Sequence, residues 1–121
     1  MKLKKLPYEL TVCEVATLDE VDPHCDFLIA AQAENGISVV CPSADVPAKA
    51  AVLADGLRGF AFQNEDRSPA GGKVQELGDV LSRAKVSALG ACSFSIGCAL
   101  VKPEDLDRAE AALVAAGYSI A

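Results

Sequence analysis

The stretch that decides the fold spans residues 97–117 and reads G-C-A-L-V-K-P-E-D-L-D-R-A-E-A-A-L-V-A-A-G. Residues 36–56 align with it without a gap, sharing a glycine at each end, a proline after the first apolar run and several alanines. Each stretch is typical of a strand, then an amphipathic helix closed by glycine, with a further apolar run behind it. We therefore predict two copies of one small α+β unit, with a seam between them where a ligand would sit.

Composition narrows the functional class. The chain has 121 residues, which suits one ordinary domain or two very small ones. Its formal net charge is −6 and it has no basic stripe with interleaved aromatics, so nucleic acid is not an expected partner. No run approaches the roughly 18 apolar residues of a membrane span, and no apolar stretch follows Met1 as in a signal peptide. We expect no membrane partner and a cytoplasmic location.

The second half reads as a complete βαββαβ unit. A helix is predicted over residues 72–84 because Val74, Leu77, Leu81 and Ala84 form one apolar stripe. Another should begin at Pro103 and close at Gly117, with acidic residues in its first turn. The predicted strands are residues 57–63, 85–94, 98–102 and 118–121, and the middle two form a hairpin across Ser95-Ile96-Gly97.

The first half reads as a shortened copy of the same unit. Strands are predicted at residues 8–15, 27–33 and 37–41, with a tight turn at Asn35-Gly36 between the last two. A short, weak helix fits within residues 17–25, and a second helix is predicted at 46–54, closed by Gly56. The strand count is one short of two units. Either strand 57–63 is shared, or another element or another chain completes an edge.

A resemblance to a known family rests on four stretches. They are L-P-Y-E-L-T-V-C at residues 6–13, I-S-V-V-C-P at 37–42, Phe94 with its following turn, and V-K-P-E-D-L at 101–106. Together with the paired βαββαβ pattern, they resemble the small bacterial tandem ACT-domain proteins. These are similar to the regulatory domains of aspartokinases and to the arginine-sensing proteins of the mTOR pathway.

The resemblance implies an α+β fold of two ferredoxin-like ACT units, with antiparallel sheets and helices on one face. Residues 1–56 would form the shortened first unit and residues 57–121 the second. It also implies a non-catalytic module, forming a homodimer, that binds an amino acid between ACT units without a cofactor. Contacts would come from the loop before the first helix and from the strand facing it. On this sequence those residues are Ser68, Gly71, Gly72, Lys73, Val74, Ser93, Phe94, Ser95 and Ile96.

The chemistry of this loop leaves two interpretations open. The first N–H groups of a helix lack partners within the helix and attract a carboxylate, and glycines let a ligand approach the backbone. Lys73 would add a positive charge there. Alternatively, Gly71 and Gly72 only turn the chain and Ser68 caps the helix.

The histidine, the cysteines and the acidic clusters of the sequence give little indication of catalysis or metal binding. The only histidine, His24, adjoins Cys25, but adjacent residues on an extended segment point to opposite sides. Cys92 and Cys98 are predicted to face each other across the second hairpin, as a redox pair or as inert buried thiols. Two acidic groups lie at helix starts, where carboxylates favour the helix dipole, and no metal is predicted; the groups are Asp19, Glu20 and Asp22, and Glu104, Asp105 and Asp107.

Three functions follow, in decreasing order of support. The first is a regulatory or sensing module for a small polar metabolite, most of all an amino acid. The second is an interaction scaffold whose sheets pair edge to edge with a partner and which takes no small ligand. An enzyme comes last, because no nucleophile–base pair and no metal cluster stands out in the sequence.

Overall fold

The strand β5 (Ala51–Gln63) belongs to two units of the chain. The structure, a computed structural model, describes residues 2–121. One unit, here called the small unit, is Tyr8–Leu57, and the other, the helical unit, combines the residues through Pro7 with Arg58–Ala121. One continuous strand therefore contributes residues 51–57 to the small unit and residues 58–63 to the helical unit. The strand predicted at residues 57–63 corresponds to its second part, and those residues are not themselves used by both units.

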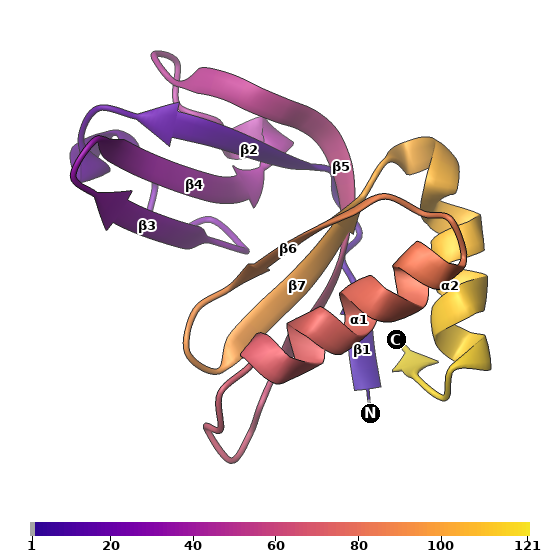
Figure 1. Ribbon diagram of the computed structural model, residues 1–121. Helices are drawn as coiled ribbons and strands as arrows, with labels where there is room; N and C mark the ends of the chain where they lie inside the picture. Colours follow the sequence, from indigo (N-terminus) through magenta and orange to yellow (C-terminus); the bar gives the residue numbers. More distant parts are fainter. Residues whose placement is uncertain (1) are drawn as a thin grey trace. The chain divides into compact units, whose positions relative to one another are not determined.

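The helical unit contains the predicted βαββαβ order. Its strands form a sheet in the order β8-β1-β5-β7-β6, and all neighbours are antiparallel except β1 and β8, which are parallel (Figure 1). After β5 come α1 (Gly71–Arg83), β6 (Ala88–Cys92), β7 (Ile96–Val101), α2 (Leu106–Ala115) and β8 (Ser119–Ile120). A single 3-10 turn, Pro103–Asp105, leads into α2, with the expected proline at its start.

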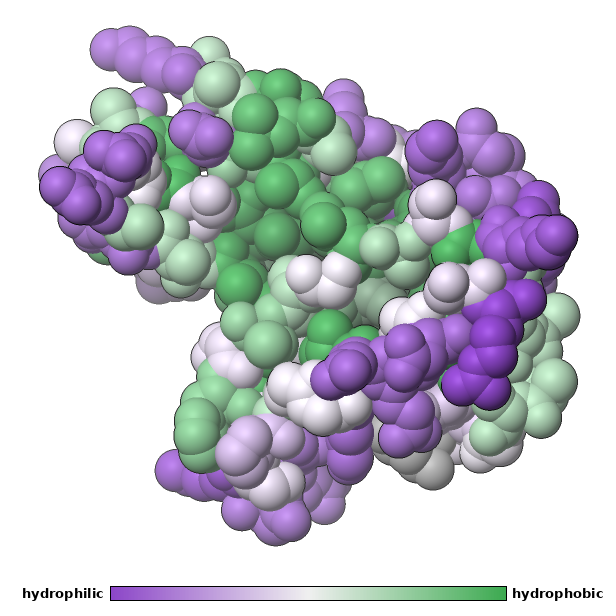
Figure 2. Space-filling view, in the orientation of Figure 1, coloured by the Kyte–Doolittle hydropathy of each residue, from purple (hydrophilic) through white to green (hydrophobic). Residues whose placement is uncertain are grey.

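The core of this unit lies between the sheet and the two helices. Leu77 and Leu81 of α1 are fully buried, as the predicted apolar stripe requires. They pack in one cluster with side chains from alternate sheet positions and from α2: Phe60, Phe62, Ala99, Val101, Ala109 and Leu113. The outward surface of α1 is hydrophilic (Figure 2). Hydrophobic burial on one stripe thus fixes both helices to one face of the sheet.

The first strand, β1 (Lys2–Lys5), corrects the predicted division at residue 56. It inserts between β5 and β8, pairing Lys4 with Ala61 and Lys2 with Ser119, so it belongs to the helical unit. Leu3 points into the core of that unit and is 0% exposed. With one buried apolar residue among three lysines, this strand carries too little alternation to be recognised from the sequence.

The small unit repeats the strand order without α-helices. Its sheet runs β3-β4-β2-β5, which matches β6-β7-β5-β8 of the helical unit once β1 is left out. The strands are β2 (Leu10–Val15), β3 (Ile29–Ala33) and β4 (Gly36–Pro42), completed by residues 51–57 of β5. The expected hairpin is confirmed, but its turn is Glu34-Asn35 and not Asn35-Gly36, because Ala33 pairs with Gly36, which already belongs to β4. Neither Asn35 nor Gly36 has a positive φ. The weak helix expected within residues 17–25 is a single 3-10 turn, Leu18–Glu20.

The helix predicted at residues 46–54 is wrong, because residues 51–54 are strand. Val46 precedes a proline and has an extended ψ of 126°, as residues before proline favour. Val52 then pairs with Cys13 of β2, so the backbone N–H and C=O groups of this segment are bonded across the sheet and not within a helix. Gly56 does take a positive φ of 67°, but within an irregular stretch of β5 and not at a helix end.

We predict that Gly97→Ala destabilises the protein by roughly 1–3 kcal/mol through overpacking. A Cβ at Gly97 would lie 2.6 Å from Val74 Cγ2 and 2.7 Å from Phe62 Cζ, both in the packed core. The matched control is Gly78→Ala within α1, where nothing lies within 4 Å of the new Cβ. Because alanine favours helix, the control should be neutral or up to about 1 kcal/mol more stable. Urea unfolding of both variants checks this, and equal stabilities would contradict the close packing.

Candidate functional site

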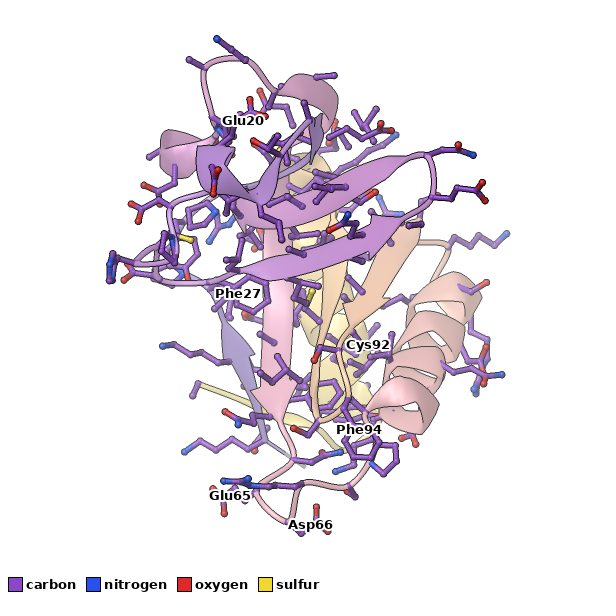
Figure 3. All side chains as sticks on the ribbon, turned by 90° about the vertical axis from the view of Figure 1, so that its left-hand side faces the viewer. Glu20, Phe27, Glu65, Asp66, Cys92 and Phe94 are labelled. Carbon is purple, nitrogen blue, oxygen red and sulfur yellow. The ribbon has the colours of Figure 1, made fainter. Side chains whose placement is uncertain are left out.

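Two segments that were expected to form a binding site lie in contact in the helical unit. The backbone N–H of Ala70, just before α1, donates to the carbonyl of Phe94 at 2.6 Å. The N–H of Asn64, just after β5, donates to the carbonyl of Ser95 at 2.9 Å. The loop from β5 to α1 is therefore fastened to the turn between β6 and β7 (Figure 3).

Asn64 organises the loop, and sequence reasoning missed it. Its side chain is 5% exposed, and its amide nitrogen donates to the carbonyls of Ser68, at 2.9 Å, and Pro69, at 3.2 Å. Its amide oxygen accepts from Lys73 Nζ at 3.0 Å. An asparagine after a strand looks like any turn residue in the sequence, so no local signal distinguishes it.

Ser68 forms hydrogen bonds within the loop and does not cap α1. Its backbone N–H and its hydroxyl both donate to Asp66 Oδ1, at 3.0 Å and 2.7 Å. These bonds, the hydroxyl first, lower the pKa of the Asp66 carboxyl, and the positive charge of Lys73 adds to the effect. The interpretation that Ser68 caps α1 is therefore wrong.

The start of α1 is open to a ligand. The cap position is Ala70, no side chain of the described residues caps the helix, and its first turn carries no acidic residue. Gly71 and Gly72 are exposed, with no atom within 4 Å of where a Cβ would stand. Because the first backbone N–H groups of a helix have no partners in the helix, this end is favourable for an anion.

The predicted site residues separate into two sets. Phe94, on the turn beside this helix start, is 68% exposed, and it lies at the same end of the unit as Glu65 and Asp66 (Figure 3). Val74 instead faces the hairpin and packs tightly over Gly97. Ile96 is the residue of β7 before Gly97, so its side chain points to the opposite face of the sheet. The structure thus brings together residues 68–73 with 93–95, but not Val74 and Ile96.

Cys92 and Cys98 do not face each other across the β6–β7 hairpin, contrary to the prediction. Cys98 pairs with Ala91 and Cys92 pairs with Gly97, so the two thiols do not face each other across the hairpin. Burial raises the pKa of the Cys98 thiol to about 12. Cys25 donates its thiol to the Phe27 carbonyl at 3.4 Å, and burial also raises its pKa. Both thiols are therefore protonated at neutral pH, which makes them poor nucleophiles.

Residues 2–121 show neither a cluster of metal-binding side chains nor a membrane-spanning helix. No three or more His, Cys, Asp or Glu side chains gather there in an arrangement that would hold a metal ion. Neither described helix has the length and apolar character needed to cross a membrane.

Comparison with known proteins identifies the fold. No family model and no curated protein matches the sequence. A solved structure from Agobacterium tumefaciens is similar with a TM-score of 0.78 and 23% identity, covering 99% of this chain and 91% of that one. A Vibrio cholerae protein of unknown function, described as a possible transport protein, has a TM-score of 0.69 and 16% identity, covering 94% and 88%.

A third similar structure is the aspartate kinase of Clostridium acetobutylicum, described as an allosteric enzyme. The TM-score is 0.60 at 12% identity, and the match covers 94% of this chain but 33% of the kinase. The chain is thus an α+β protein of the ferredoxin-like, ACT-type fold, and its expected resemblance to aspartokinases is confirmed at the level of fold. The likeness to arginine-sensing proteins stays a prediction.

We predict that Asn64→Ala costs roughly 1–3 kcal/mol of stability, because it leaves two partly buried carbonyls without their donor. Amide exchange should become faster at Ala70, whose N–H donates to Phe94, and at position 64, whose N–H donates to Ser95. Asn35→Ala, in the exposed turn of the β3–β4 hairpin, is the control and should change stability by less than about 0.5 kcal/mol. Unchanged exchange at Ala70 would show that Asn64 does not hold the loop.

Proposed function

We propose that the chain is a non-catalytic regulatory module that binds a small polar metabolite, an amino acid above all, at the start of α1. The observation that carries the proposal is the uncapped first turn of α1 beside the exposed Phe94. Gly71 and Gly72 leave the helix backbone open there, and the hydrogen bond from Ala70 to Phe94 holds the facing turn in place.

The groups around this helix start suit a zwitterion. A ligand carboxylate would accept from the free N–H groups of the first turn, where the helix dipole also favours negative charge. A ligand ammonium would find Phe94, whose exposed ring face attracts cations, and Asp66, whose lowered pKa keeps it ionised. The side chain of the bound amino acid would lie over the Phe94 ring.

Regulation would follow because the ligand would connect two segments of the helical unit. The loop after β5 and the turn after β6 are joined by two backbone hydrogen bonds, and a ligand bridging them would favour the joined state. The shared fold with part of an allosteric aspartate kinase supports this proposal. The module would then report a metabolite level to a separate protein or to another copy of itself.

A thermal-shift screen over the proteinogenic amino acids tests the proposal. At a hundredfold excess over Kd, a true ligand should stabilise the wild-type protein by about 2.7 kcal/mol. Gly72→Val should abolish the shift by covering the backbone, whereas Gly78→Val, on the same helix with equally open space, should keep it. No shift with any amino acid would exclude this class of ligand, and binding that survives Gly72→Val would place the ligand elsewhere.

A second candidate function, association through a sheet edge, is supported by β6. Among the described residues this strand pairs only with β7, so its other edge is free. Residues 86–101 contain no charged side chain, and Leu89 is 46% exposed. Natural edge strands are usually protected by charges, proline or bulges, and an unprotected edge pairs readily with another strand. A second copy of the same chain is the simplest partner and would give a homodimer.

We predict that Leu89→Lys weakens this self-association at least tenfold, because it places a charge on the edge that must pair. Val114→Lys adds the same charge at an exposed apolar position of α2, away from β6, and should leave association unchanged. Sedimentation equilibrium of the wild type and both variants measures the effect. A wild type that stays monomeric at high concentration would contradict the proposal.

A further inference from the structure

A groove opens in the helical unit where β1 and β5 part. Its volume is about 760 Å³, and its lining includes Lys2, Lys4, Ala61, Gln63, Asn64 and Lys73. Pairing between the two strands reaches only Lys4 with Ala61, after which β1 pairs with β8 alone and β5 continues to Gln63 beside β7. The small side chain of Ala61 keeps the space next to Lys4 open.

Two lysines in this groove have no charged partner. Lys2 and Lys4 lie two residues apart on one strand, so their side chains leave the same face at a spacing of roughly 7 Å. Neither ammonium is within ion-pair distance of a carboxylate in residues 2–121, and their cross-strand neighbours, Ser119 and Ala61, are uncharged. The two exposed ammonium groups repel each other weakly, and an anion bound between them would remove this repulsion.

The neighbouring lysine shows the contrast. Lys5 points to the opposite face of β1, where its Nζ lies 2.7 Å from Glu110 Oε1 of α2. The chain therefore pairs one lysine of this strand and leaves two unpaired at the groove, although its formal net charge is −6.

The rest of the lining limits what fits. Lys73 carries a third positive charge, but its Nζ is held by Asn64 Oδ1 at 3.0 Å. Two carboxylates, Glu65 and Asp66, lie at the loop end of the groove, and Oδ1 of Asp66 accepts from the N–H and the hydroxyl of Ser68. Leu3 and Phe62 also border the groove, but their side chains pack into the core. The two unpaired lysines make the β1 side of the groove cationic.

We propose that this groove binds a small molecule with two acidic groups, a dicarboxylate, with its anionic groups on Lys2 and Lys4. Asp66 borders both this site and the proposed amino-acid site, but the anion-binding groups differ: this site uses lysines of β1 and not the α1 backbone or Phe94. A chain with both sites would respond to two metabolites.

Succinate is the probe, titrated into the full-length wild-type protein and followed by amide NMR shifts. We expect saturable shifts centred on residues 2–5 and 61–63, an affinity that falls with added salt, and no shifts with the uncharged succinamide. The double variant Lys2→Gln with Lys4→Gln should weaken succinate binding at least tenfold. Lys5→Gln removes one lysine of the same strand but faces the other side, and should bind succinate as the wild type does.

Three results would overturn the proposal. They are the absence of saturable shifts at β1, an equal loss of binding in Lys5→Gln, and loss of succinate binding in Gly72→Val. The last variant also separates the two proposals, since it should lose amino-acid binding but keep succinate binding. Circular dichroism of each variant checks that it is folded, which is expected because Lys2 and Lys4 are exposed and Lys5 is partly exposed.

Discussion

The backbone of β5 is the constraint on which both sheets depend. Residues 51–57 of this strand pair with β2 in the small unit, and residues 58–63 pair with β7 and β1 in the helical unit. The change occurs next to Gly56, whose N–H donates to Asp55 Oδ1 at 2.8 Å. The same oxygen accepts from the buried Thr11 hydroxyl at 2.6 Å, which fixes the irregular stretch in place and lowers the pKa of Asp55. One strand thus supplies the fourth strand of one copy and the first strand of the next.

The parts of the fold that could be predicted are those with a strong local period. The stripe of Leu77 and Leu81 and the alternation of Phe60 and Phe62 both mark the face that is buried. Residues 51–54 read Ala-Val-Leu-Ala, which shows neither helical nor strand periodicity. Pairing with β2 makes this segment a strand, and the sequence does not reveal that pairing. β1 was missed for the same reason: its place is set by partners more than fifty residues away in the chain.

The candidate site shows the same limit. The loop before α1 and the turn at Phe94 were predicted together from the family resemblance, and hydrogen bonds join them. The buried role of Asn64 could not be predicted, because it depends on carbonyls and on a lysine that only the folded loop brings within reach. Val74 and Ile96 were assigned because they fall in the loop and strand segments that the family resemblance implied. Ile96 lies one residue before Gly97, and a shift of one residue along a strand reverses the face.

The close packing of Val74 has a mechanical consequence. The side chain stands in a notch made by two glycines, and a Cβ at Gly90 or Gly97 would be 2.7 Å or 2.6 Å from it. Such close contact leaves no free space around the Val74 side chain. Close-packed elements are hardly compressible, so they shift together as rigid bodies. We therefore expect a shift of the first turn of α1 to move β6 and β7 with it. Val74, which is partly buried against the core, would couple the start of the helix to the free edge of the sheet.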